Sequence, residues 1–131
     1  MVEAHAWNEE LDVAHEAMDH DHHLQIALVS AFADAVEQRR PWLARRLAEQ
    51  LVRYSAAHFA SEELLMQAAG YPEREAHAAE HGAFLVQMRD LEATFDEEAA
   101  EAALAAALDL RSALAGHIKG ADRRLVNAVG R

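Results

Sequence analysis

The chain has 131 residues, a formal net charge of −11 and an isoelectric point near 5.1, and 52% of its residues are hydrophobic. This length predicts one domain, and the composition is typical of a soluble helical protein. The negative charge excludes nucleic acids and anionic membrane surfaces as partners, because both repel an acidic protein.

Cysteine is absent, which excludes disulfides, thiolate metal sites and cysteine nucleophiles. No apolar run approaches the roughly 18 residues of a membrane span. The N-terminus carries acid where a signal peptide has basic residues. We therefore expect a cytoplasmic protein with no membrane association. The nine histidines are unusual for a chain of this length, so their positions require an explanation.

The sequence divides into an arm and four helices. Residues 1–17 contain Trp7 but show no sustained period, which predicts an N-terminal arm packed loosely over the rest. Hydrophobic periodicity, with Pro41 at one helix start and Gly70 at that helix's end, predicts helices over about 18–38, 41–69, 73–95 and 99–119. Helices of this length with short connections pack as antiparallel neighbours. We therefore expect an all-α, up-down-up-down antiparallel four-helix bundle in a single domain over 1–131.

Three histidines lie near the start of the first helix, and helical phase separates them. The positions 4, 7, 11 and 14 residues after His22 are all apolar, whereas the same steps from His23 lead to Ala27 and then to the polar residues Ser30, Asp34 and Glu37. His20 lies on a boundary line and is interpreted as a surface residue. We therefore expect His22 to point into the core and His23 to point outward.

The second and third helices each carry a pair of metal-binding residue types four positions apart. The second has His58 and Glu62, and the third has His77 and His81. Residues at i and i+4 share one helix face, so each pair can hold a common metal ion. A single pair of this kind is weak evidence, because helices carry such pairs by chance. Two pairs in line with core positions bury several ionisable side chains, and this is costly unless something compensates for their lost hydration. A bound cation is the simplest compensation.

The fourth helix carries His117 on its core stripe, and Asp122 follows five residues later. A spacing of five differs in phase from a spacing of four by about 100°. Either Asp122 approaches from beside His117, or the helix is locally wound wider, which nearby Gly116 and Gly120 permit. Taken alone, Asp122 is also explained as an ordinary charge near a helix end.

Five histidines and two carboxylates from four helices exceed the four ligands that one zinc ion takes. Two metals are therefore implied. Two six-coordinate ions have twelve coordination positions. The five histidines fill five of them and two bridging carboxylates fill four, which leaves three positions for a bridging oxygen and an open site. Imidazole and carboxylate suit iron but also permit manganese, cobalt, nickel or zinc. The seven candidate ligands are His22, His58, Glu62, His77, His81, His117 and Asp122.

Over nearly its whole length the chain resembles the hemerythrin family, specifically the single-domain bacterial form. The resemblance rests on a tryptophan in the arm and on five motifs. These are Asp19-x-x-His22, His58-Phe59-x-x-Glu62-Glu63, Gly70-Tyr71-Pro72, His77-x-x-x-His81 and His117-Ile118-x-x-x-Asp122.

The resemblance implies a non-haem di-iron centre, bridged by an oxo or hydroxo group and by the two carboxylates. It assigns His77, His81 and His117 to one iron. It assigns His22 and His58 to the other, whose open position would take dioxygen.

Three residues match family positions that line the dioxygen pocket: Phe59, Leu114 and Ile118. One departure is Ala113, where many relatives have tryptophan. We expect the smaller residue to open a path for water or small molecules.

The function that the resemblance implies is reversible dioxygen binding for storage, delivery or sensing, by a binding protein rather than an enzyme. The alternative is a di-iron peroxidase or oxidase that uses the same centre. The paired Glu-x-x-His motifs of ferritin-like bundles are absent, and a purely structural or metal-buffering role leaves the ligands on core faces unexplained. Dioxygen is the expected partner, no protein partner is indicated, and we expect a monomer because no apolar outer stripe remains.

Overall fold

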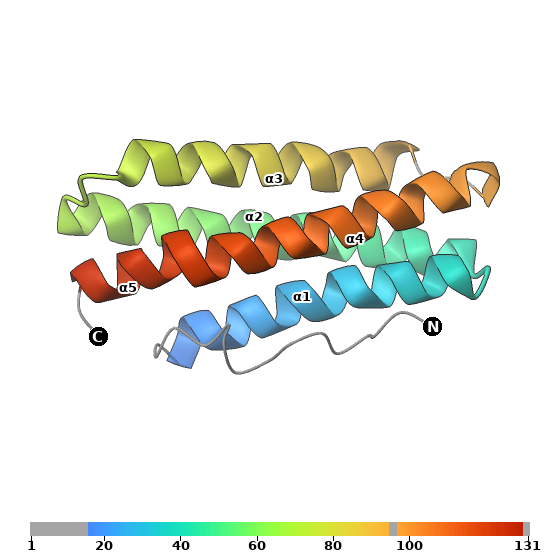
Figure 1. Ribbon diagram of the computed structural model, residues 1–131, viewed down its shortest axis with the longest axis horizontal. Coiled ribbons are helices and arrows are strands. Elements are labelled where there is room, and N and C mark those ends of the chain that lie inside the picture. The colour runs from blue at the N-terminus through green and yellow to red at the C-terminus, as the bar shows by residue number, and fades with distance from the viewer. Residues whose placement is uncertain (1–15, 95–96, 130–131) are drawn as a thin grey trace.

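The computed structural model describes residues 16–94 and 97–129, and these residues are helical, with short connections and no strand. The long helices are α1 (Glu16–Glu37), α2 (Pro41–Ala69), α3 (Arg74–Thr94) and α4 (Ala100–His117), with a 3-10 turn, η2 (Glu97–Ala99), before α4. A π-helical segment, η3 (Ile118–Asp122), and α5 (Arg123–Val129) extend α4 along the same direction (Figure 1). The predicted all-α four-helix bundle is confirmed.

The connection between α1 and α2 and the end of α2 follow from local backbone chemistry. Pro41 occupies the first turn of α2, where its missing N–H costs no hydrogen bond. Gly70 ends this helix in the left-handed conformation, with φ of 63°. Before α2, Arg39 adopts φ of 58°, which is unfavourable for a residue with a Cβ atom.

Two ranges differ from the sequence prediction. Of the predicted arm, residues 1–15, which include Trp7, lie outside the described residues, and Glu16 and Ala17 already belong to α1. The sequence predicts that the fourth helix ends near residue 119, but helical structure continues to Val129. It continues because η3 widens the helix without breaking it.

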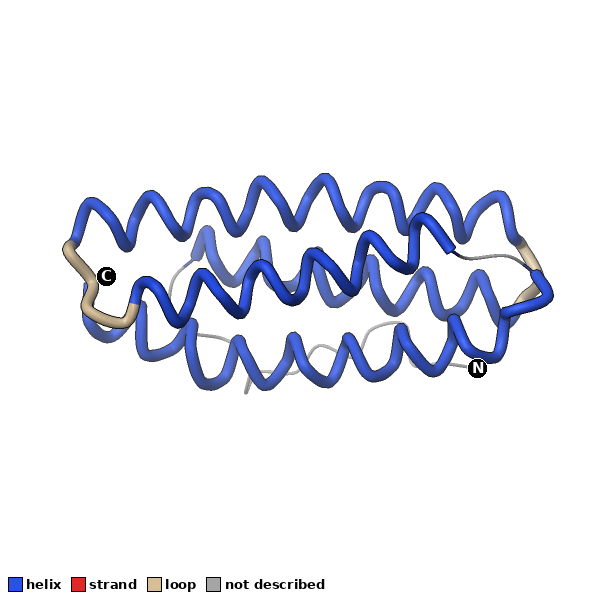
Figure 2. Tube along the Cα trace, turned by 90° about the horizontal axis from the view of Figure 1, so that it is seen from above, coloured by secondary structure: helices blue, strands red, loops and turns tan. Residues whose placement is uncertain are grey.

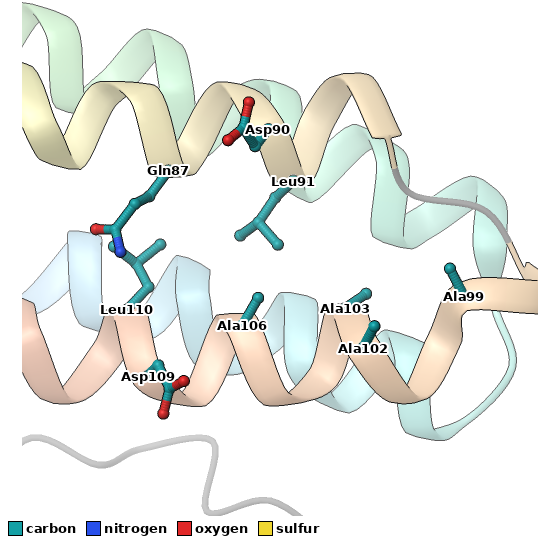
Figure 3. Close-up of a pocket in the computed structure, with 9 residues that line it drawn as sticks. All are labelled: Gln87, Asp90, Leu91, Ala99, Ala102, Ala103, Ala106, Asp109 and Leu110. Atoms are coloured by element: carbon teal, nitrogen blue, oxygen red, sulfur yellow. The ribbon is translucent and has the colours of Figure 1, made fainter.

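The four long helices lie side by side, with the connecting loops at the two ends of the bundle (Figure 2). α1 packs against α2 and α4, and α2 packs against α1 and α3, whereas α3 and α4 make the sparsest contact among neighbours. A cavity of about 360 Å³ lies between them, lined by Leu91, Leu110 and alanines of α4 such as Ala103 (Figure 3). None of the candidate metal ligands lines this cavity.

The core is apolar along most of the bundle and becomes polar toward one end. Phe32, Leu51 and Met88 are among its fully buried side chains. The predicted inward face of α1 is confirmed, since Ile26, Val29, Ala33 and Val36 are all buried. Because the helices alternate in direction, the starts of α1 and α3 meet the ends of α2 and α4. None of the described helices has the length and apolar character needed to cross a membrane.

Candidate metal centre

The structure brings all seven predicted residues together inside the bundle. Their exposures are His22 0%, His58 4%, Glu62 2%, His77 3%, His81 1%, His117 5% and Asp122 1%. His20 and His23 are exposed instead, so the choice of His22 as the inward histidine of α1 is confirmed. Burying this many ionisable groups away from water is unfavourable unless they compensate one another or a metal compensates them.

Glu62 lies at the middle of the cluster, and its two oxygens face different histidines. Oε1 lies 2.9 Å from Nε2 of His77 and 3.1 Å from Nε2 of His81. Oε2 lies 2.8 Å from Nε2 of His58 and 3.4 Å from Nε2 of His22. One carboxylate oxygen therefore faces histidines of α3, and the other faces the histidines of α1 and α2.

Asp122 divides its oxygens in the same way. Oδ1 lies 3.0 Å from Nε2 of His77 and 3.1 Å from Nε2 of His117, whereas Oδ2 lies 2.9 Å from Nε2 of His22. The π-helical segment η3 spans the five residues from Ile118 to Asp122, and its wider turn places this carboxylate on the face of His117. Of the two sequence-based explanations for the spacing, the locally wider helix is the one that occurs.

The cluster therefore separates into two overlapping groups of possible ligands. One contains Glu62, His77, His81, His117 and Asp122, and the other contains His22, His58 and Glu62. Within each group the ligand atoms all lie within 4.8 Å of one another. The Oδ2 atom of Asp122 extends the second group, because it contacts His22.

Several of these short contacts do not have the geometry of a good hydrogen bond. Nε2 of His58, His81 and His117 is buried and lacks a hydrogen-bond partner in the described structure. Each of these atoms nevertheless lies within 3.1 Å of an oxygen of Glu62 or Asp122. Nitrogen and oxygen atoms that lie this close without hydrogen bonding fit ligands directed at a common ion. The donor set of imidazole and carboxylate also fits iron.

In the metal-free protein the buried groups compensate one another by charge. Burial disfavours a protonated His22, but its contacts with Asp122 and Glu62 outweigh this effect and raise its pKa to about 9. His77 responds to burial and to the same two carboxylates in the same way, and its pKa is also raised to about 9. The pKa of Glu62 and that of Asp122 are held well below their usual range by the surrounding histidines, against the effect of burial. A metal ion that binds here would therefore displace protons from this site.

Three further carboxylates contact the outer nitrogens of the histidines. Nδ1 of His58 lies 3.0 Å from an oxygen of Asp21. Nδ1 of His81 lies 2.9 Å from Glu63, and Nδ1 of His117 lies 2.7 Å from Glu80. With Nε2 free for a metal, Nδ1–H donates to the carboxylate, which fixes the ring orientation and raises the basicity of the ligand nitrogen.

Sequence reasoning missed these three carboxylates as functional residues. Glu63 and Glu80 are sequence neighbours of Glu62 and His81, and Asp21 immediately precedes His22. An acid directly beside three of the candidate ligands, His22, Glu62 and His81, is the signal that the sequence offers. Neighbours on a helix are rotated by about 100°, however, so each of these acids contacts a histidine of another helix.

The predicted pocket residues are also buried near the cluster. Phe59 is 2% exposed, and its ring stacks on that of His81 with centroids 4.1 Å apart. Leu114 is 0% and Ile118 is 1% exposed. Ala113, by contrast, is exposed on α4. The presence of alanine at position 113 in place of a larger residue therefore does not change the buried Leu114. The expected opening for small molecules stays a prediction.

Comparisons with known proteins agree with this site. Residues 13–129 match the family described as the hemerythrin HHE cation binding domain. The chain is 29% identical to the bacteriohemerythrin of Pseudomonas paraeruginosa over 89 residues, which cover 68% of this chain and 58% of that protein. It is 26% identical to the bacteriohemerythrin of Stenotrophomonas maltophilia over 129 residues, covering 94% and 80% of the two chains.

A myohemerythrin is similar to the chain at comparable identity. The chain is 27% identical to the myohemerythrin of Theromyzon tessulatum over 120 residues, covering 92% of this chain and 89% of that protein. The chain spans less than two thirds of the length of the Pseudomonas bacteriohemerythrin. No solved structure matches the chain at a comparable level of significance.

Proposed function

The chain belongs to the hemerythrin family, whose members are di-iron, oxygen-binding proteins, and on this premise we propose that it binds dioxygen reversibly at a pair of non-haem irons. The proposed ligands are His22, His58, Glu62, His77, His81, His117 and Asp122. The proposed role is dioxygen storage, delivery or sensing.

One observation carries this proposal, namely the division of both buried carboxylates between two groups of histidines. Glu62 directs one oxygen toward the α3 histidines and the other toward histidines of α1 and α2. Asp122 directs one oxygen toward histidines of α3 and α4 and the other toward His22 of α1. A single ion has no use for a carboxylate whose second oxygen faces other ligands. Two ions bridged by both carboxylates use every one of these oxygens.

In this proposal His77, His81 and His117 hold one iron, and His22 and His58 hold the other, with Glu62 and Asp122 shared. When bound, two ferrous ions supply the two electrons that dioxygen takes up on binding and returns on release. The unequal number of histidines leaves the two-histidine side with fewer protein ligands, which makes it the side for dioxygen.

The surrounding residues would keep water away from the bound ligand. Phe59, Leu114 and Ile118 are nearly fully buried and carry no polar side-chain atom, so they offer neither a proton nor a hydrogen-bond partner. Such an apolar lining favours release of intact dioxygen over protonation and loss of a reduced product. This apolar lining supports the proposal of reversible binding over turnover.

The test is to load the metal-free protein with ferrous iron without oxygen, admit air, and then remove the oxygen under vacuum while recording visible absorption. We expect two irons per chain and an absorption band that appears with oxygen and disappears when oxygen is withdrawn. A protein that is oxidised irreversibly on first contact with air, or that turns over added peroxide, would contradict reversible binding.

A further inference from the structure

The three outer carboxylates follow a regular pattern around the bundle. Asp21 of α1 contacts His58 of α2, and Glu63 of α2 contacts His81 of α3. Glu80 of α3 in turn contacts His117 of α4. Each of these three histidines thus contacts an acid on the preceding helix.

The contact at His58 has an additional component that the other two lack. The hydroxyl of Tyr54 donates a hydrogen bond of 2.6 Å to Oδ1 of Asp21, while Oδ2 of the same carboxylate contacts Nδ1 of His58. Tyr54 and His58 lie four residues apart on α2, so they share a helix face. Asp21 therefore bridges two positions of α2 from α1.

This bridge matters because Asp21 is partly open to water. Its side chain is 33% exposed, so without a second contact its carboxylate could rotate into solvent and leave His58. The hydrogen bond to Tyr54 holds the carboxylate in the orientation that serves His58. Glu63 and Glu80 are 42% and 49% exposed, and no second contact to either acid occurs in the described part of the chain.

The two sides of the centre also differ in how many histidines are supported. On the three-histidine side, His81 and His117 both contact an outer carboxylate. On the two-histidine side, His58 contacts Asp21, but Nδ1 of His22 is buried without a hydrogen-bond partner among the described residues. The two-histidine side thus depends on a single outer contact.

We propose that Tyr54 is a positioning residue for the two-histidine side, that it acts by anchoring Asp21 against His58, and that this side takes up metal last and releases it first. The proposal rests on the proposed two-metal centre and adds an order of loading and the residues that set it. Removing an outer partner of a ligand typically weakens metal binding by about 10- to 100-fold.

The test uses the metal-free protein titrated with Co²⁺ in the absence of oxygen, followed by calorimetry and visible absorption. We expect two binding steps of unequal affinity. Tyr54→Phe should weaken the second step by about 10-fold and leave the first unchanged, and Asp21→Asn should weaken the same step by about 10- to 100-fold. The double variant should be no weaker than Asp21→Asn alone, because Tyr54 acts through Asp21.

Two matched controls separate this effect from a general loss of structure. Tyr71→Phe removes the same hydroxyl from a tyrosine that interacts with Glu73 and Arg124 and lies beside His77 on the three-histidine side, so it should leave the second step unchanged. Glu80→Gln should weaken the first step, because Glu80 supports His117 on the three-histidine side. Asp21→Asn tests the same contact from α1 if Tyr54→Phe does not fold.

The outcomes distinguish this proposal from the proposed function. If the unmodified protein binds fewer than two Co²⁺ ions, the two-metal centre is wrong and this proposal falls with it. If it binds two ions but Tyr54→Phe leaves the second step unchanged, or weakens both steps equally, the centre stands and the role of Tyr54 is wrong. Additive effects in the double variant would equally overturn the anchoring of Asp21 by Tyr54.

Discussion

Glu62→Ala is the substitution for which the structure makes the sharpest prediction. The two oxygens of Glu62 face four histidine nitrogens at 2.8 to 3.4 Å, so its removal takes one possible ligand from each metal. Loss of an outer contact costs about 10- to 100-fold in metal affinity, and loss of a direct, shared ligand should exceed the upper value for both ions. We therefore expect the variant not to retain the iron pair.

The neighbouring acid cannot replace Glu62. Glu63 is rotated by about 100° on α2, and it contacts the outer nitrogen of His81 at 2.9 Å. The assay is iron content per chain after anaerobic loading and desalting, with circular dichroism to verify that the bundle is folded. His23→Ala is the matched control, since His23 is exposed and should be dispensable for two irons. Full iron loading of Glu62→Ala would refute the bridging role.

Three other predictions concern pH, the pocket and a loop. The pKa values of His22 and His77 are about 9 in the metal-free folded protein, against 6.5 for a free histidine. Protonation of these two histidines therefore adds to the free energy of unfolding, fully below pH 6.5, and this contribution is lost as pH rises through 9. Urea unfolding of the metal-free protein should thus show lower stability at pH 10 than at pH 6, and the reverse order would refute this charge compensation. Leu114→Asn should shorten the lifetime of the oxygen-bound form roughly tenfold, measured as decay of the visible band. Ala113→Asn, at an exposed position, should leave that lifetime unchanged. If the two variants shortened the lifetime equally, the claim that the buried apolar lining protects the oxygen-bound form would be wrong. Arg39→Gly should stabilise the protein by up to about 1 kcal/mol in urea unfolding, because glycine tolerates φ of 58°, and a loss of stability would contradict strain there.

Much of the site could be predicted from helical phase, because a residue's position on a helix face is a local property. Phase identified His22 rather than His23, and it placed His58 and Glu62 on one buried face. The position of Asp122 could not be predicted in this way. Its five-residue spacing fits the face of His117 only when the local winding is π-helical, and winding depends on what the segment packs against.

The outer contacts lay further beyond sequence reasoning. Asp21, Glu63 and Glu80 each act on a histidine of the next helix, so their roles depend on how neighbouring helices are rotated and shifted against one another. No spacing within one helix contains that information. The same holds for Tyr54, which lies on the face of His58 but reaches it through an acid of α1.

The most direct measurement of the central claim is anomalous diffraction at the iron edge from crystals of the iron-loaded protein. The division of the two carboxylates predicts two peaks per chain, one next to His77, His81 and His117 and the other next to His22 and His58. Glu62 and Asp122 should each contact both peaks. A single peak per chain, or a second peak away from His22 and His58, would contradict the proposed centre.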